Sequence, residues 1–187
     1  MHPLSINEVK KELYTVEEYL TWDEGFRAEL YEGRLIMMAP PTASHQSVLG
    51  EIFVQLHNFL KGKSCKVYPA PFGVKLFDNE ETIFEPDVVV ICDKTKVDNI
   101  CHGAPDMVIE VRSPTTAKRD LNEKYKKYEQ AGVREYWIVD PEANHVQAGV
   151  LHDGKFITKL FGIEDELAPV SVLEGCVINL KDVFSEE

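Results

Sequence analysis

The chain has 187 residues, of which 44% are hydrophobic and 28% are charged, values that are ordinary for a globular protein with one sizeable core. Its 20 basic and 32 acidic residues give a net charge of −12, so any contact with nucleic acid must use a local basic patch. No apolar run reaches the length of a membrane span, and residues 1–20 lack the apolar stretch of a signal peptide. We therefore expect a cytoplasmic protein with no membrane partner.

The four cysteines are scattered along the chain, at Cys65, Cys92, Cys101 and Cys176. They form no C-x-x-C pair and share no repeated spacing with histidines, so a zinc site would need ligands from distant segments. We expect reduced thiols, most of them buried.

The N-terminal part of the chain predicts a short helix and a hairpin. Residues 15–18, TVEE, form a capping box that opens a helix. Residues 27–31 and 34–38 then flank a Glu32-Gly33 turn, which is typical of two paired strands.

The middle of the chain predicts one long helix followed by strands. Apolar residues recur at helical spacing from position 48 to position 60, and Gly62 ends the helix. Short runs rich in valine and isoleucine then alternate with proline, glycine and aspartate, a pattern typical of strands. These runs are residues 65–69, 72–77, 86–92 and 106–112.

The last part of the chain predicts a crossover helix and a C-terminal hairpin. A helical segment that stops at Gly132 separates strand 106–112 from a further strand, residues 135–140. Two strands joined in this way lie parallel, with a right-handed crossover. A hairpin around the Asp153-Gly154 turn follows.

These elements predict an α/β fold with a mixed β-sheet flanked by helices, in a single domain of residues 1–187. The core would cover about residues 43–141. An N-terminal helix and hairpin at 15–39 would precede it, and a C-terminal β extension at 145–184 would follow.

The segment around Asp106 and Glu110 looks like a nuclease site compressed into one strand. Four residues along a strand span about 13 Å, which is too far for two carboxylates to hold one metal ion. Asp87, at the start of the preceding strand, would lie beside Glu110 if the two strands are antiparallel neighbours. We therefore predict that Asp87 and Glu110 form the pair and that Asp106 lies at the opposite end of the sheet.

Alternation along its strand places Glu110 among valines and isoleucines. A carboxylate in such surroundings has a basic partner or a metal ion. Both alternatives stay open, and in the first the base would be Arg112 or another cation.

One lysine of the crossover helix flanks the face that packs on the sheet. Helical spacing places Lys124 beside this buried stripe, and its long side chain could carry the ammonium towards the carboxylates. Lys126 and Lys127 point elsewhere, and a solvated face is the simplest interpretation of both.

Two further residues allow more than one interpretation. His45, near the start of the long helix, points inward in the same sector as Ile52; a core or capping histidine is the commoner explanation, and a group that binds a metal-bound water is the other. Glu29 alternates with Leu30 in the hairpin, and by itself it would be taken for a surface acid.

Five segments of the chain carry a resemblance to one family. They are ELYEGRLIMM, SHQ, EPDVVV, APDMVIEVRSPTT and RDLNEKYKKYEQAGVREYWIVDP. In this order and spacing they resemble signatures of the Uma-type restriction endonucleases, a bacterial family, once a domain of unknown function, assigned to the PD-(D/E)xK nuclease superfamily. The match runs from about Thr15 to the C-terminus.

The resemblance implies a restriction-endonuclease-like core, with the long helix and the crossover helix on opposite faces of the sheet. It selects Asp87 as the motif aspartate and Glu110 as the motif acid. Arg112 stands where the superfamily usually has a lysine, and the resemblance suggests that the lysine has moved to Lys124.

The chemistry implied by the resemblance is hydrolysis of DNA phosphodiester bonds with Mg²⁺ or Mn²⁺. Asp87, Glu110 and the backbone carbonyl of Val111 would hold the ion through oxygen ligands. Lys124 would help to deprotonate the attacking water or would stabilise charge on the phosphorane.

Three more residues receive supporting roles from the resemblance. Glu29 and His45 match recurring positions of the family. Glu29 could complete the metal shell or a second one, and His45 could orient a water. Arg112 would support the site from the position that the lysine has left.

Other functions stay open beside a DNA endonuclease. The net charge of −12 would suit a non-catalytic nuclease-like module that binds a protein or a nucleic acid, and an RNA-cleaving or other phosphodiesterase activity is a third hypothesis. A basic strip beside the carboxylates would favour nucleic acid; its members would be Lys118, Arg119, Lys126 and Lys127. By analogy we expect a homodimer, because cutting both strands of a duplex calls for two sites.

Overall fold

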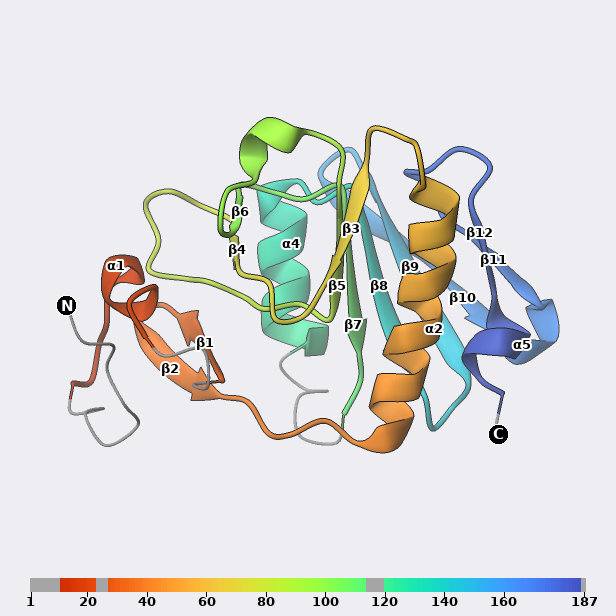
Figure 1. Ribbon diagram of the computed structural model, residues 1–187, viewed down its shortest axis with the longest axis horizontal. Coiled ribbons are helices and arrows are strands. Elements are labelled where there is room, and N and C mark those ends of the chain that lie inside the picture. The colour runs from red at the N-terminus through yellow and green to blue at the C-terminus, as the bar shows by residue number, and fades with distance from the viewer. Residues whose placement is uncertain (1–10, 23–26, 114–119, 186–187) are drawn as a thin grey trace.

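A six-stranded mixed sheet runs through the middle of the protein and carries a helix on each face (Figure 1). The computed structural model describes residues 11–22, 27–113 and 120–185. From one edge to the other the strands are β10 (Lys155–Gly162), β9 (His145–His152), β8 (Glu135–Asp140), β7 (Met107–Val111), β5 (Val88–Ile91) and β3 (Lys66–Pro69). The predicted α/β fold with a mixed sheet is confirmed.

The centre of the sheet is a parallel pair. β7 and β8 run parallel, as the helix between them requires, and their other neighbours in the sheet run antiparallel. The crossover consists of a π-helical turn, η3 (Asp120–Lys124), that leads into α4 (Tyr125–Ala131). Gly132 ends α4 with φ 85°, a left-handed conformation that glycine adopts without steric cost.

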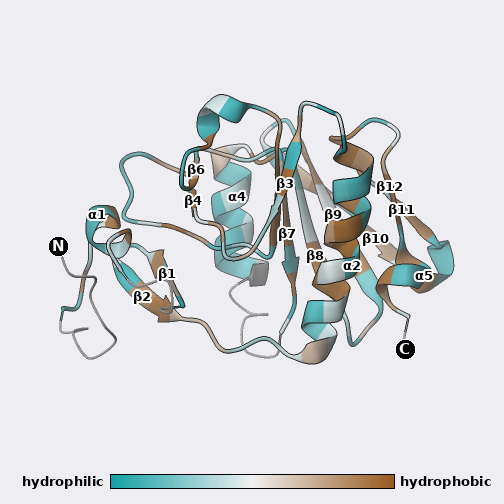
Figure 2. Cartoon of the chain, in the orientation of Figure 1, coloured by the Kyte–Doolittle hydropathy of each residue, from teal (hydrophilic) through white to brown (hydrophobic). Residues whose placement is uncertain are grey.

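The two faces of the sheet bury two sets of side chains. On one face α2 (Ala43–Leu60) places Ile52 and other apolar side chains against Met107 and Ile109 of β7. On the other face Tyr128 of α4 packs with Val108, which lies between Met107 and Ile109 in β7. Figure 2 shows hydrophobic residues along the central strands and on part of α2. The alternation predicted for β7 is confirmed.

The N-terminal elements form backbone hydrogen bonds with residues 81–83, which precede β5. They are α1 (Val16–Tyr19), β1 (Ala28–Tyr31) and β2 (Arg34–Met37). β1 pairs with β2 on one side; on the other, the backbones of Leu30 and Ile83 exchange hydrogen bonds of 3.0 and 2.8 Å. β1 therefore has a backbone partner on each side and is an inner strand. Its first three side chains are buried and the fourth is half-buried.

The C-terminal hairpin continues the main sheet, because β9 pairs with β8. The remaining elements are the parallel pair β4 (Val74–Lys75) and β6 (Cys101–His102), the antiparallel pair β11 (Leu167–Pro169) and β12 (Val177–Asn179), the 3₁₀ turns η2 (Lys94–Lys96) and η4 (Ile163–Asp165), and α5 (Leu180–Val183). Figure 1 places the N-terminal hairpin and the C-terminal strands at opposite ends of the protein.

The expectation of reduced thiols is wrong for two of the four cysteines. Cys65 and Cys92 form a disulfide, whereas Cys101 and Cys176 are buried free thiols. Lys66 pairs with Ile91 in the β3–β5 ladder, so the cysteines are the next residues outward on two adjacent antiparallel strands. Their separation of 27 residues along the chain gave no sign of this contact.

Among the helices of the described residues, none combines the length and the apolar character needed to cross a membrane.

Candidate active site

The start of β5 and the end of β7 bring Asp87 and Glu110 together. The two strands pair antiparallel with Val88 opposite Ile109, so the next residue outward on each strand is one of the two acids. This is the register predicted from the strand order.

Asp106 lies at the other end of the same strands and has structural partners there. One carboxylate oxygen accepts a hydrogen bond of 2.7 Å from the backbone N–H of Cys92, and the other is 3.1 Å from Arg134 Nη1. These contacts join the ends of neighbouring strands. The prediction that Asp106 is not part of the acidic pair is confirmed.

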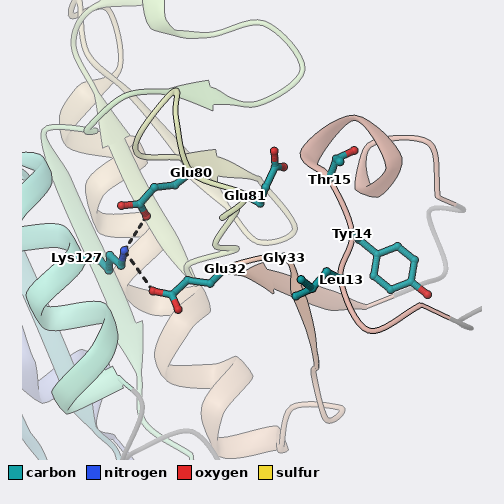
Figure 3. A pocket seen from close by; sticks show the side chains of 8 residues that line it. All are labelled: Leu13, Tyr14, Thr15, Glu32, Gly33, Glu80, Glu81 and Lys127. Atoms are coloured by element: carbon teal, nitrogen blue, oxygen red, sulfur yellow. Dashed lines mark hydrogen bonds and ion pairs between the residues drawn. The ribbon is translucent and has the colours of Figure 1, made fainter.

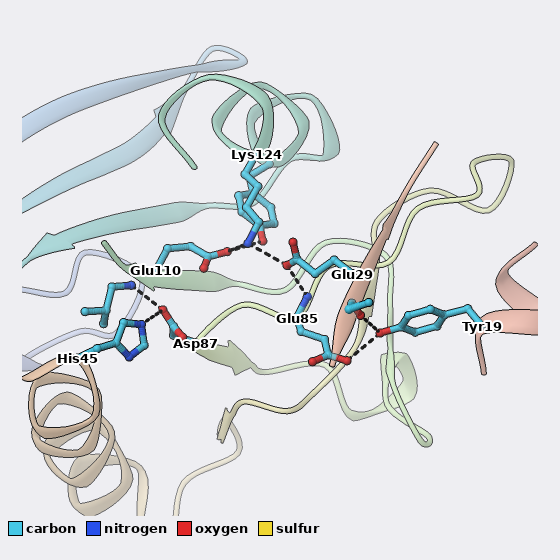
Figure 4. A network of polar contacts seen from close by, with 10 residues as sticks. Tyr19, Glu29, His45, Glu85, Asp87, Glu110 and Lys124 are labelled. Atoms are coloured by element: carbon cyan, nitrogen blue, oxygen red, sulfur yellow. Dashed lines mark hydrogen bonds and ion pairs between the residues drawn. The ribbon is translucent and has the colours of Figure 1, made fainter. Parts of the chain in front are cut away.

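Lys124 lies between two buried carboxylates (Figure 4). Its Nζ is 2.6 Å from Glu110 Oε1 and 2.9 Å from Glu29 Oε1, and the three side chains are only 5%, 6% and 2% exposed. The Tyr128 hydroxyl donates a further hydrogen bond of 3.2 Å to Glu110 Oε1. The base that pairs with Glu110 is therefore Lys124, and the alternative pairing with Arg112 is wrong.

The crossover segment explains how Lys124 reaches the sheet. Lys124 is the last residue of the η3 turn and the N-cap of α4, one turn before the buried Tyr128. Its ammonium lies 5.5 Å from the centre of the Phe84 ring, a distance at which the ring face attracts a cation. The helical periodicity predicted this placement.

Glu29 is buried, so the interpretation as a surface acid is wrong. Its neighbours Ala28 and Leu30 are fully buried too. Besides Lys124, Glu29 Oε1 accepts a hydrogen bond of 2.9 Å from the backbone N–H of Glu85. The hairpin thus brings an acid to the segment that ends at Asp87.

His45 points at Asp87 from the first turn of α2. Its Nε2 is 3.2 Å from Asp87 Oδ2, and that oxygen also accepts a hydrogen bond of 2.7 Å from the backbone N–H of Val111. The cap of the helix is Thr42, whose hydroxyl accepts from the His45 N–H, so the capping interpretation of the imidazole is wrong.

The charge of Asp87 sets the protonation of His45. Burial disfavours the imidazolium, but the hydrogen bond and the charge of Asp87, with a further contribution from the backbone of Val111, raise the pKa of His45 overall. Nδ1 of the ring is buried and has no hydrogen-bond partner in the described part of the chain.

Arg112 turns to the neighbouring strand. Its Nη1 forms an ion pair with Asp140 at the end of β8, and the other Asp140 oxygen accepts hydrogen bonds of 3.1 Å from the backbone N–H groups of Glu142 and Ala143. Arg112 therefore holds the carboxyl ends of β7 and β8 together. Arg112 thus pairs with Asp140, whereas Lys124 pairs with Glu110.

The four basic residues predicted for nucleic-acid contact do not form one described surface. Lys118 and Arg119 lie outside the described residues. Lys126 is exposed, as expected. Lys127 is half-buried, with Nζ 2.7 Å from Glu80 Oε2 and 3.8 Å from Glu32 Oε1, so its interpretation as a solvated residue is wrong.

Lys127 and its acids border a pocket of about 470 Å³ beside the N-terminal segment (Figure 3). Burial lowers the pKa of Lys127, but the hydrogen bond to Glu80 and its charge raise it overall, so the lysine stays a cation held by acids. The pocket is lined by Leu13, Tyr14, Thr15, Glu32, Gly33, Glu80, Glu81 and Lys127. None of the predicted metal ligands lines it.

Sequence reasoning missed two groups that border the site. The Tyr19 hydroxyl lies 2.7 Å from Glu85 Oε1 and 2.8 Å from the carbonyl oxygen of Ala28, and so joins α1 to the segment before Asp87. Arg27 precedes β1 and carries a buried Nε without a described hydrogen-bond partner. The contact between Tyr19 and Glu85 joins residues far apart in the chain, so no local sequence pattern predicted it.

The donor chemistry of the site fits a hard divalent cation. Asp87, Glu110 and Glu29 supply carboxylate oxygens, which Mg²⁺ and Mn²⁺ prefer. Lys124 takes the place between Glu110 and Glu29, and within the described ranges no three acids, histidines or cysteines are grouped to hold a metal ion.

Comparisons with known proteins agree with this geometry. The model of the Uma2 family, described as "Putative restriction endonuclease", matches residues 16–181. An uncharacterized protein, slr1290, from Synechocystis is 25% identical over 163 residues, which cover 83% of this chain and 84% of the relative. A crystal structure of a "putative nuclease belonging to DUF820" from Anabaena variabilis covers 91% of this chain and 97% of its own, with a TM-score of 0.75 and 22% identity. At that identity, the likeness establishes the fold.

Proposed function

Because the chain belongs to the Uma2 family of restriction-endonuclease-like proteins, we propose that it is a metal-dependent endonuclease that hydrolyses DNA phosphodiester bonds. One observation carries the proposal: Lys124 meets Glu110 and Glu29 at the edge of the sheet where Asp87 lies beside Glu110. Burying charged groups of this kind costs desolvation free energy, and such clusters are typical of sites that catalyse reactions.

Asp87, Glu110 and the backbone carbonyl of Val111 would hold Mg²⁺ or Mn²⁺, with Glu29 as a further carboxylate donor. The ion would polarise the phosphate and lower the pKa of a bound water. The peptide of Val111 already contacts Asp87 through its N–H, which supports its place in this set.

Lys124 and His45 would then handle protons and charge. The ammonium of Lys124 can donate to an oxygen of the phosphorane or take part in deprotonating the attacking water. His45 is oriented by Asp87 through Nε2, and its Nδ1 is free to position a water. Arg112, paired with Asp140, would keep the end of β7 in place.

Cleavage of supercoiled plasmid DNA with Mg²⁺ or Mn²⁺ tests the proposal. We expect Asp87→Asn and Lys124→Met to lower the cleavage rate by about 10²-fold or more, because each removes a group that acts on the reacting phosphate. Asp106→Asn is the matched control, since Asp106 is a carboxylate at the far end of the same strands. The proposal is refuted if purified Asp87→Asn cuts as fast as the wild type.

A non-catalytic module that binds a protein or a nucleic acid is the second candidate. Two observations favour it: the net charge of −12, and the engagement of Lys124 and Lys127 by acids. In that case the folded wild type would cut neither plasmid DNA nor RNA with either metal. Cleavage of RNA alone would assign the third hypothesis.

A homodimer would present two sites to the two strands of a duplex, and we propose this state for the active protein. Sedimentation of the protein with and without duplex DNA measures it. A monomer in both conditions would contradict the proposal.

A further inference from the structure

Arg27 is a cation for which the described residues provide no acidic partner. Its side chain is half-buried, its Nε is buried without a hydrogen-bond partner in the described ranges, and no described carboxylate pairs with it. A buried guanidinium N–H without an acceptor lowers stability, so this group calls for an explanation.

Acids hold several of the other basic side chains, including Arg112, the second described arginine with a buried Nε that has no hydrogen-bond partner. The sequence has 32 acidic residues for 20 basic ones. Described pairs of this kind are Lys11 with Glu18, Arg112 with Asp140, Lys127 with Glu80, Arg134 with Asp106, Lys155 with Glu129, and Lys181 with Glu166.

The backbone directs Arg27 towards the carboxylate site. Arg27 immediately precedes β1, and its carbonyl oxygen accepts a hydrogen bond of 3.0 Å from Met38, which extends the hairpin ladder. Side chains two residues apart on a strand share a face, so Arg27 lies on the face of Glu29, whose carboxylate contacts Lys124.

The electrostatics of His45 agree with this placement. Burial lowers the pKa of His45 and the positive charge of Arg27 lowers it further, although Asp87 raises it overall. The guanidinium is therefore close enough to the Asp87–His45 pair for its charge to be felt there.

The site needs such a cation if it is to accept a phosphate. Asp87, Glu110 and Glu29 gather three carboxylates here; Lys124 contacts Glu110 and Glu29, and His45 contacts Asp87. A phosphodiester anion approaching these acids is repelled unless further positive charge accompanies it.

We propose that Arg27 binds a backbone phosphate of the nucleic acid beside the scissile bond, with its two Nη groups donating to oxygens of the same phosphate. The planar fork of a guanidinium matches the oxygens of a phosphate in this way. This inference rests on the proposed function and adds to it a residue that holds the substrate.

Binding of a fluorescent duplex oligonucleotide, measured by anisotropy at several salt concentrations with Ca²⁺ in place of Mg²⁺, tests the role of Arg27. We expect Arg27→Met to weaken binding about tenfold or more, because a charge-assisted contact is lost. The slope of log affinity against log salt should fall by roughly 0.9, the value for one phosphate contact. Arg27→Lys should keep the slope and recover only part of the affinity, because it retains the charge without the fork.

Arg134→Met is the matched control, because Arg134 pairs with Asp106 at the far end of the sheet. It should bind with wild-type affinity and slope. Arg27→Met should also unfold at a temperature no lower than the wild type, since it removes a buried N–H without a partner. A marked drop in that temperature would assign Arg27 a structural role and overturn the inference.

The outcomes separate this inference from the proposed function. If Arg27→Met binds like the wild type while the wild type cuts DNA in an Asp87-dependent way, the inference on Arg27 alone fails. If binding depends on Arg27 but nothing is cut, the endonuclease proposal alone fails. A wild type that binds no oligonucleotide overturns both.

Discussion

Two buried acids share one cation at the site, and the free energy of unfolding depends on that sharing. Glu110 and Glu29 both contact Lys124, and all three side chains are almost inaccessible to water. Two buried carboxylates that meet at one ammonium supply oxygen ligands of the kind that a divalent cation prefers.

Replacing the lysine should therefore destabilise the fold. We expect Lys124→Met to lower the free energy of unfolding by about 3 kcal/mol, because it leaves two buried carboxylates without their cation. Urea denaturation in the absence of metal measures the change. Adding Glu29→Gln to Lys124→Met should restore part of the loss, and a double variant less stable than the single one would contradict this explanation.

At the scale of elements, the site depends on how α4 is held against the sheet. Glu129, near the end of α4, accepts hydrogen bonds of 3.0 Å from the backbone N–H of Phe156 and 2.7 Å from Lys155 Nζ, both on β10. These bonds tie the helix that carries Lys124 to the C-terminal hairpin. The hydrogen bond from Lys155, followed by the one from Phe156, lowers the pKa of Glu129.

This tie should depend on pH in a defined direction. A pKa of Glu129 that is lower in the folded protein than its ordinary value of 4.5 means that the stabilisation is present above pH 4.5 and is lost as the pH falls through the folded pKa. We expect Glu129→Gln to cost about 1 kcal/mol at pH 7 and progressively less below pH 4.5. Urea denaturation across this range measures it, with the exposed acid variant Glu174→Gln as the control, and a cost that grows in acid would contradict the account.

The sequence was sufficient to predict contacts that depend on regular geometry. Strand order and antiparallel register predicted that Asp87 and Glu110 are neighbours, and helical periodicity predicted which lysine reaches them. The burial of Glu29 was not predictable in this way. Glu29 contacts Glu85 and Lys124, two residues far along the chain whose positions beside β1 no local pattern predicts.

Irregular segments account for the other differences. Lys127 looked solvated because its partner, Glu80, lies in a loop whose path no periodicity describes. The Cys65–Cys92 disulfide depends on the pairing of β3 with β5, which the sequence did not specify. The sequence did not single out Arg27, because only the structure shows that its Nε is buried without a hydrogen-bond partner among the described residues.

At the scale of the whole molecule, the disulfide cross-links the edge strand β3 to β5. It closes a loop of 27 residues, and a cross-link of this span stabilises a protein by up to about 3 kcal/mol by restricting the unfolded chain. It also lies at the opposite end of β5 from Asp87.

Reduction should thus weaken the fold and spare the site. We expect the double variant Cys65→Ala/Cys92→Ala to unfold at a lower urea concentration than the oxidised wild type, and to cut plasmid DNA at a similar rate under conditions where both are folded. Cys176→Ala is the control for the removal of a buried thiol. Equal stability of the double variant and the oxidised wild type would contradict the prediction.

The spread of the site along the chain has a consequence for its biosynthesis. Its acids and its lysine come from β1, from the start of β5, from the end of β7, and from the turn before α4. A ribosome must therefore deliver the chain beyond Lys124 before the four groups can meet. A nascent chain released earlier holds only an incomplete set and would lack the proposed power to cut the nucleic acid around it.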